Sequence, residues 1–346
     1  MNYKISIIVP FYYKEKIVRK DIQELDLLSF DKCLSAIFKS EYKNYEVIAI
    51  SDGSSKESIR IVQKYNCKII KSKKNYGAAI SRNKGANISK GKILLFLDSD
   101  VQIKKNAFSI INKFFNTKNN DGLLQGVYSH KPDYKSSITQ YLHSYHCYHL
   151  FSQTKKNKYT KTVCTAFFSI RKDIFNKYKG FNEKFIKASA EDVDFGFKLI
   201  QDQYKIKIER KLNAIHHIDF NIVSFIRRII RLHTDEMKMY LRNRSVSLKV
   251  KQSNYSIVIL GIFLILLILT SIFINFFYSI IFFKEMLITL NLFFIAIHQN
   301  FLKFIFKTKG LTTSLKSIIY VYLHRFLFTV CIFRGLVDFY ILRNKY

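Results

Sequence analysis

An apolar run followed by two carboxylates constrains the fold of this 346-residue chain more than any other stretch. Five consecutive apolar residues, Ile93–Leu97, predict a strand buried on both faces, which is typical of a parallel sheet covered by helices. Asp98 and Asp100 follow this strand directly. Because ligands of open α/β sheets bind beyond the carboxyl ends of the strands, the two carboxylates favour a divalent cation held together with a substrate phosphate. Taken alone, the same residues also suit a simple turn.

Alternating strand and helix patterns predict an α/β domain over roughly the first 220 residues. We expect strands at 5–9, 45–50, 68–71, 93–97, 123–128, 163–170, 206–208 and 213–217. We expect helices at 31–41, 56–65, 78–89, 105–116 and 191–200, with 14–30 as a charged connection. Ser55 is positioned to cap the second helix, and Pro10 is expected to end the first strand because proline cannot donate to a central ladder.

The charge balance implies an anionic partner. The chain has 57 Lys+Arg against 25 Asp+Glu, a formal net charge of +32. Phosphorylated ligands, acidic lipid headgroups and nucleic acid all satisfy this requirement. The five cysteines show no C-x-x-C spacing, which favours free thiols in a reducing compartment over disulfides or a zinc site. No signal-peptide pattern precedes the first strand, so we expect none.

The last third of the chain has the composition of a membrane region. Residues 257–283 carry no charge and exceed the ~20 residues that one helical span needs. We predict spans at about 256–276 and 286–306. The charged stretch at about 311–342 is predicted to lie in the membrane interface, as is the basic amphipathic stretch 223–253. For the latter, an ordinary solvated helix is the alternative. The predicted catalytic domain is thus 1–222, and the membrane region is 254–346.

Basic residues flank the two predicted spans on one side. Arg242, Arg244, Lys249 and Lys251 precede the first span, and Lys303, Lys307 and Lys309 close the second. The positive-inside bias then predicts that both ends of this pair are cytoplasmic. We therefore expect localisation to the cytoplasmic membrane, with the catalytic domain on the cytosolic side.

Several short motifs occur in a meaningful order. They are Ile7-Ile8-Val9-Pro10-Phe11-Tyr12, Ser51-Asp52-Gly53-Ser54, Asn75-x-Gly77 with Arg82-Asn83, Asp98-Ser99-Asp100 and Glu191-Asp192. As a set they resemble the family 2 glycosyltransferases, inverting enzymes with the GT-A fold, over roughly residues 4–220. The resemblance implies an α/β fold with a mostly parallel central sheet flanked by helices, here followed by C-terminal membrane helices.

The resemblance also implies a nucleotide-sugar site with a bound Mg²⁺ or Mn²⁺. The residues implied to bind the donor are Pro10, Tyr12, Asp52, Gly77, Arg82, Asp98 and Ser99. Among them, Asp52 would contact a uracil-type base, and Arg82 would lie near the diphosphate. The implied metal ligands are Asp100, Asp98 and His216, with His217 as the fallback. A purely structural role for His216 also remains open.

The implied catalytic residues are Asp192 and Glu191. An acceptor hydroxyl must lose a proton as it attacks, and Asp192 is expected to accept this proton while Glu191 orients the acceptor. The positive end of the helix that Asp192 begins is expected to keep its carboxylate ionised. The loop Gly180–Glu183 resembles the family's acceptor loop.

Two departures from the family pattern concern the substrates. Ser51 replaces the usual first Asp of the second motif, which leaves the donor base open, although a UDP-sugar is expected. The chain has no Trp, so the Q-x-x-R-W signature of processive relatives is missing and a single addition is favoured.

We therefore expect a membrane-associated, metal-dependent glycosyltransferase of surface glycan or glycolipid synthesis, with a sugar or lipid-linked acceptor. One alternative is a nucleotidyltransferase on a related fold. The other is a non-enzymatic basic protein that binds membrane or nucleic acid. No nucleic-acid partner is expected, because a groove that binds phosphate backbones avoids carboxylates.

Overall fold

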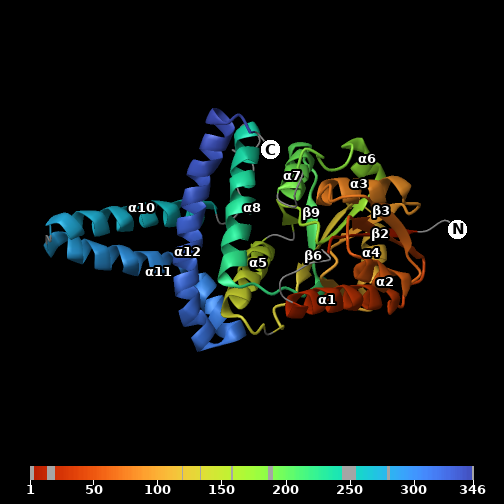
Figure 1. The fold of residues 1–346 in the computed structure, drawn as a ribbon, viewed down its shortest axis with the longest axis horizontal. Helices are drawn as coiled ribbons and strands as arrows, with labels where there is room; N and C mark the ends of the chain where they lie inside the picture. The colour runs from red at the N-terminus through yellow and green to blue at the C-terminus, as the bar shows by residue number, and fades with distance from the viewer. Residues whose placement is uncertain are drawn as a thin grey trace. The chain divides into compact units, whose positions relative to one another are not determined.

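The computed structural model describes residues 4–13, 20–118, 120–132, 134–156, 159–185, 190–243, 255–278 and 281–344. The predicted roles of Arg244, Lys249 and Lys251 lie outside these residues. The chain divides into two compact units. We call them the sheet unit, residues 1–129 and 153–218, and the helical unit, residues 130–152 and 219–346 (Figure 1).

The sheet unit contains a nine-stranded mixed sheet with the order β3-β2-β1-β4-β8-β6-β9-β5, and β7 pairs with β9. The strands are β1 (Ile5–Phe11), β2 (Tyr45–Asp52), β3 (Lys68–Ser72), β4 (Ile93–Leu97), β5 (Val101–Ile103), β6 (Leu123–Tyr128), β7 (Tyr159–Thr160), β8 (Phe167–Arg171) and β9 (Ile206–His216). The first four strands of the order run parallel to one another. The predicted α/β class is thereby confirmed.

Strand β4 lies at the centre of the core, as its unbroken apolar sequence predicted. It pairs with β1 in parallel and with β8 antiparallel, and all five of its side chains are buried. The ring of Phe96 lies 5.1 Å from the rings of both Phe175 and Phe181. These aromatic contacts fix β4 against the segments that precede α7, so the end of β4 is held in place by a rigid core.

The helices of the sheet unit are α1 (Lys20–Phe38), α2 (Lys56–Gln63), α3 (Ala78–Ile88), α4 (Ala107–Phe115), α6 (Lys172–Lys177) and α7 (Glu191–Gln201). The predicted cap of α2 is confirmed: the Ser55 hydroxyl accepts a hydrogen bond from the Ser58 amide at 3.3 Å. Helix α3 approaches the sheet closely at Gly85. A Cβ there would lie 2.6 Å from Cγ2 of Ile8 and 2.8 Å from Cδ1 of Ile50.

Three sequence predictions for this unit were wrong. Strand β1 does not stop at Pro10 but pairs with β2 as far as Phe11. The pairing of β1 with β4 ends at Ile8, so no described strand is hydrogen-bonded to that edge of β1 at Pro10. The absence of a backbone N–H in proline is therefore tolerated there. The helix predicted from residue 31 begins at Lys20. The two short strands predicted at 206–208 and 213–217 form the single strand β9.

The helical unit consists of long helices around an apolar core. These are α5 (Ser137–Lys156), α8 (Ile222–Arg242), α10 (Tyr255–Tyr278), α11 (Ile281–Lys309) and α12 (Leu311–Leu336), followed by the π-helical turn η1 (Val337–Ile341). Helix α8 packs along α12, and α10 packs along α11 (Figure 1). Tyr141 of α5 packs edge-on against Phe225 of α8 and Phe301 of α11. The sequence did not predict α5.

Among the described residues, three helices are long and apolar enough to cross a membrane: Ile257–Phe277, Lys284–Lys309 and Leu311–Ile341. The first two match the predicted spans. The third was predicted to lie in the interface, and that placement stays a prediction. The sheet unit ends at Ile218 and leaves out residues 130–152, whereas the predicted catalytic domain ran unbroken to 222.

Candidate active site

The turn after β2 is fixed by a buried carboxylate. Asp52 is 4% exposed, and its Oδ1 and Oδ2 accept hydrogen bonds from the amides of Tyr76 and Gly77 at 2.9 and 2.8 Å. Gly53 has φ +75°, and a Cβ there would lie 2.7 Å from the carbonyl carbon of Lys74. Asp52 therefore ties two predicted donor-binding motifs together. Its predicted contact with a nucleotide base stays a prediction.

The end of β1 reaches the turn after β4 through a tyrosine. The Tyr13 hydroxyl lies 2.9 Å from the hydroxyl of Ser99, and the Tyr13 ring packs 5.4 Å from that of Phe30. Its neighbour Tyr12 is 41% exposed, so its ring is accessible to a ligand. The sequence predicted donor-binding roles for Tyr12 and Ser99 but did not predict the contact between Tyr13 and Ser99. The sequence pattern that could have pointed to this contact is the second tyrosine, Tyr13, which directly follows Tyr12 after the first strand.

Arg82 joins the turn after β4 to the first turn of α7. Its Nη2 donates to Oδ1 of Asp98 and its Nη1 to Oε1 of Glu191, each at 2.8 Å. The side chains of Arg82 and Glu191 are both 4% exposed. Burial lowers the pKa of Arg82, but the charges of Asp98 and Glu191 outweigh burial and raise this pKa, so the guanidinium stays charged. In this structure Arg82 bridges two carboxylates, and its predicted contact with a diphosphate stays a prediction.

Asp192 lies in the first turn of α7 and accepts two backbone hydrogen bonds. The amide of Val193 donates to Oδ1 at 2.8 Å, and that of Thr165 donates to Oδ2 at 3.3 Å. Burial and the neighbouring charge of Glu191 nevertheless raise the pKa of Asp192 to about 7. Burial therefore outweighs the amides in setting this pKa, and the expectation that the helix end keeps the carboxylate ionised stays a prediction. A carboxyl group that titrates near neutral pH is well matched to accepting a proton.

Two of the three predicted metal ligands, Asp100 and His216, meet where β5 lies beside β9, whereas Asp98 is bound by Arg82. The Oδ2 of Asp100 lies 3.3 Å from Nε2 of His216, and Val101 pairs with His216 in the sheet. The His216 ring stacks on Tyr128 with a centroid separation of 4.4 Å. His217 instead places its Nε2 2.8 Å from Oε1 of Gln102. Of the two candidate histidines, His216 is therefore the one that faces Asp100.

The donor set at Asp100 fits a divalent cation that shares its shell with a substrate. Within the described residues, no group of three or more His, Cys, Asp or Glu side chains could hold a metal ion, so Asp98 does not join Asp100 and His216 in one such group. The carboxylate of Asp100 and the imidazole of His216, 3.3 Å apart, are both groups that could bind such a cation. Mg²⁺ commonly takes one or two carboxylates and completes its shell with substrate phosphates and water.

The loop before α7 is anchored on α3 by Asn83. Its Nδ2 donates to the Phe181 carbonyl and to Oε1 of Glu183, and its Oδ1 accepts from the Phe181 amide, each at 2.9 Å. Gly180 has φ +73°, and a Cβ there would lie 2.5 Å from the Asn83 amide oxygen. The predicted acceptor loop is thus hydrogen-bonded to Asn83, the residue that follows Arg82. Sequence reasoning identified both stretches but not the contact between them.

Comparisons with known proteins agree with this architecture. GlyG, a glycosyltransferase of Streptococcus pneumoniae serotype 4, is 26% identical over 135 residues, which cover 38% of this chain and 41% of GlyG. The poly(ribitol-phosphate) β-N-acetylglucosaminyltransferase TarS of Staphylococcus aureus strain Mu50 is 29% identical over 126 residues, covering 35% of this chain and 20% of TarS. This chain thus matches well under half of the length of each relative.

The fold is also found among solved structures. The mannosyltransferase PcManGT of Pyrobaculum calidifontis, solved with GDP-Man and Mn²⁺, superposes with a TM-score of 0.55 at 11% identity. The match covers 98% of this chain and 87% of PcManGT. Residues 6–179, half of the chain, match the family described as Glycosyl transferase family 2. With its mixed GT-A-type sheet and its ordered motifs in place, the chain belongs to glycosyl transferase family 2.

Proposed function

We propose that this protein is a membrane-associated, inverting glycosyltransferase that moves one sugar from a nucleoside-diphosphate sugar to an acceptor hydroxyl. The observation that carries the proposal is the presence of two separate carboxyl sites in the sheet unit. Asp98 and Asp100 follow β4 and lie beside Arg82 and His216. Asp192, whose pKa is raised to about 7, lies at the start of α7. These are the groups needed to bind a phosphorylated donor and to deprotonate an acceptor.

The donor end of the site requires charge compensation. Displacing a nucleoside diphosphate from an anomeric carbon builds negative charge on the leaving phosphate. A Mg²⁺ or Mn²⁺ held by Asp100 and His216, with Asp98 beside them, would supply electrostatic stabilisation of that charge. Arg82 holds Asp98 through one hydrogen bond, so it orients the carboxylate nearest to the donor. The donor expected from the sequence is a UDP-sugar; the solved neighbour PcManGT holds GDP-Man, so both nucleotides should be tested.

The acceptor end of the site requires a proton acceptor. As the hydroxyl oxygen forms its bond to the anomeric carbon, its proton passes to the ionised carboxylate of Asp192, and the nucleoside diphosphate leaves from the opposite face. The amides of Val193 and Thr165 fix both oxygens of this carboxylate. Glu191, held by Arg82, supports the position of its neighbour. The acceptor loop is held by Asn83, which favours a formed acceptor subsite next to α7.

The helical unit supports a membrane location for this reaction. Three of its helices have the length and composition of spans. A sugar or lipid-linked acceptor of surface glycan or glycolipid synthesis would be available at such a location. The cytosolic orientation of the sheet unit is part of this proposal and rests on the positive-inside bias.

The proposal is tested with the full chain in uncharged detergent and a panel of UDP- and GDP-sugars, each with and without Mn²⁺. A donor present at one hundred times its Kd should raise the stability of the folded protein by about 2.7 kcal/mol. Asp100→Ala should lose the part of this increase that depends on Mn²⁺. Asp121→Ala, which removes an exposed carboxylate bound to the Lys205 amide, is the matched control and should keep it.

Each result of this experiment is informative. If Asp100→Ala and the unmodified protein gain the same stability from Mn²⁺ and donor, the metal assignment is wrong. If no nucleotide sugar stabilises the unmodified protein, the proposed function is wrong.

A further inference from the structure

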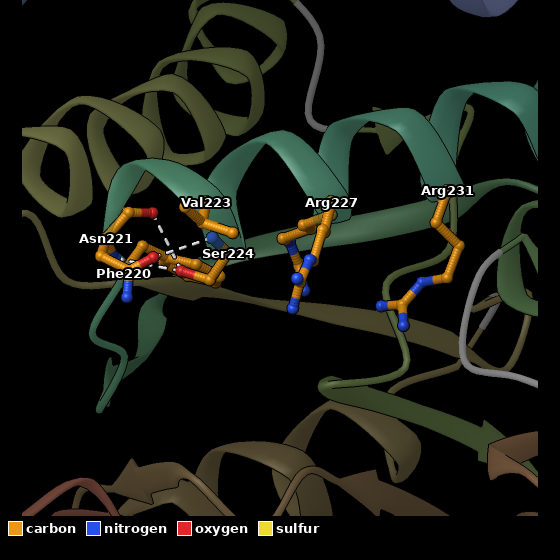
Figure 2. A pocket seen from close by; sticks show the side chains of 7 residues that line it. Phe220, Asn221, Val223, Ser224, Arg227 and Arg231 are labelled. Atoms are coloured by element: carbon orange, nitrogen blue, oxygen red, sulfur yellow. Dashed lines mark hydrogen bonds between the residues drawn. The ribbon is translucent and has the colours of Figure 1, made fainter. Parts of the chain in front are cut away.

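A cationic pocket lies at the beginning of α8 in the helical unit. It has a volume of about 330 Å³ and is lined by Phe220, Asn221, Val223, Ser224, Arg227, Arg228 and Arg231. Figure 2 shows Arg227 and Arg231 extending from successive turns of α8 on the side where Phe220 and Asn221 lie. Three of the seven lining residues are arginines and none is acidic. The pocket volume is several times the ~30 Å³ that one water molecule occupies in the liquid.

The pocket has a rigid wall formed by the start of the helix. Oδ1 of Asn221 accepts from the Ser224 amide at 2.9 Å, and the Ser224 hydroxyl accepts from the Asn221 amide at 3.0 Å. This reciprocal cap fixes the first turn of α8. Phe225 and Ile229 of the same helix are buried in the core of the helical unit. The arginine-bearing side of α8 is therefore held in position independently of any ligand.

Two of the arginines of the pocket, Arg227 and Arg228, are not neutralised by acidic residues in the part of the chain that the structure describes. No ion pair among the described residues includes Arg227 or Arg228. The Arg228 guanidinium lies 5.6 Å from the centroid of the Phe220 ring, and its Nε is buried with no hydrogen-bond partner. Stacking against an aromatic face holds a guanidinium in one orientation. A buried donor without a partner indicates a missing acceptor.

We propose that this pocket binds a phosphate group. Guanidinium groups donate in parallel pairs to phosphate oxygens, and a phosphate monoester carries close to two negative charges at neutral pH. Apolar side chains beside the arginines favour a lipid as the bearer of the group: Ile222 is 45% exposed and Val223 is 50% exposed. Such side chains enter the acyl boundary of a membrane while the neighbouring arginines meet the headgroup phosphates. This proposal does not depend on the catalytic assignment.

The experiment compares three full-length proteins in uncharged detergent at matched ionic strength. These are the unmodified chain, the pocket variant Arg227→Gln/Arg228→Gln, and the control variant Lys303→Gln/Lys307→Gln, which removes two exposed cations of α11. Each is titrated with phosphatidic acid, with phosphatidylcholine and with inorganic phosphate, and thermal stability is recorded. Arg227→Gln alone serves as a second variant, since this exposed residue contributes little to packing and should fold normally.

Phosphatidic acid should stabilise the unmodified chain and the control variant. Its affinity should fall by about tenfold for each guanidinium removed from the pocket. If inorganic phosphate also binds, and its affinity falls equally in the Arg227→Gln/Arg228→Gln variant, the pocket binds a soluble phosphate. If only phosphatidic acid loses affinity in that variant, the phosphate group bound by the pocket belongs to a lipid. Equal stabilisation of all three proteins, or of none, overturns the proposal.

Discussion

At the scale of single residues, the candidate site is organised by one buried arginine. Arg82 contacts Asp98 and Glu191, which lie in stretches far apart in the sequence, and both contacts are 2.8 Å long. Because Arg82 and Glu191 are each 4% exposed, neither charge is compensated by water. Removing one partner of such a pair leaves the other as an unpaired buried charge. Arg82 is therefore expected to matter for folding as well as for the site.

Arg82→Ala should destabilise the protein by about 3–5 kcal/mol, the usual cost of leaving a buried charge without its partner. The double variant Arg82→Ala/Glu191→Ala should be more stable than Arg82→Ala, because it removes the stranded carboxylate. Thermal melting in uncharged detergent measures both. Lys177→Ala, which breaks the exposed ion pair with Asp202, is the control and should change stability only slightly. A loss for Arg82→Ala no larger than for the control would contradict this account.

At the scale of elements, the sequence predicted those whose local pattern matches their final environment. Strand β4 was predicted because five apolar residues can only be buried on both faces. Helix α2 was predicted from the Ser55 cap. Helix α5 was missed because its sequence mixes His, Tyr and Ser without an apolar stripe, and its burial is created by α8, α11 and α12. Packing between elements distant in the chain decides such a case.

The same limit applied to the site. Motif order predicted roles for Asp98, Asp100 and Asp192, since polar residues at strand and helix ends leave a local signature. The contacts of Arg82 with Glu191 and of Asn83 with Phe181 depend on where α3 lies relative to the loop before α7. No local pattern contains that information. The raised pKa of Asp192 likewise follows from burial, which the sequence does not specify.

The close packing of α3 on the sheet gives a prediction at this scale. Gly85→Ala places a methyl group within 3 Å of Ile8 and Ile50, and overpacking of this kind should cost about 1–3 kcal/mol. Gly196→Ala in α7 is the control. Both variants gain up to about 1 kcal/mol of helix propensity, but the new Cβ of Gly196→Ala would lie 3.1 Å from the Val163 amide nitrogen, a looser contact than those at Gly85. Thermal melting should separate the two variants, and equal midpoints would show that α3 does not need a glycine at this position.

At the scale of the whole molecule, the main question is how many of the apolar helices cross the membrane. The sequence predicted two spans and an interfacial helix. Length and composition allow all three helices to span. Two spans place both ends of the helical region on one side, whereas three place the C-terminus on the opposite side from residue 254.

Labelling of single cysteines in a background without the five native ones distinguishes these arrangements. With an impermeant reagent on intact cells, Ser279→Cys between the two predicted spans should be modified, and Asn344→Cys should be modified only after lysis. Modification of Asn344→Cys before lysis would show that the third helix crosses the membrane. Protection of Ser279→Cys would contradict the predicted orientation.

The central claim is that Asp192 accepts the proton of the acceptor hydroxyl. The test measures sugar transfer and donor affinity across pH for the unmodified protein and for Asp192→Asn, which keeps the shape of the side chain but cannot accept the proton. Since the pKa of Asp192 is raised to about 7, transfer by the unmodified protein should fall as pH decreases through about 7, where the carboxylate becomes protonated. Asp192→Asn should bind donor nearly as well, transfer roughly 10²–10⁴-fold more slowly than the unmodified protein above pH 7, and lose the fall in rate through pH 7. Full activity in Asp192→Asn would contradict the account and shift the role of base to Glu191.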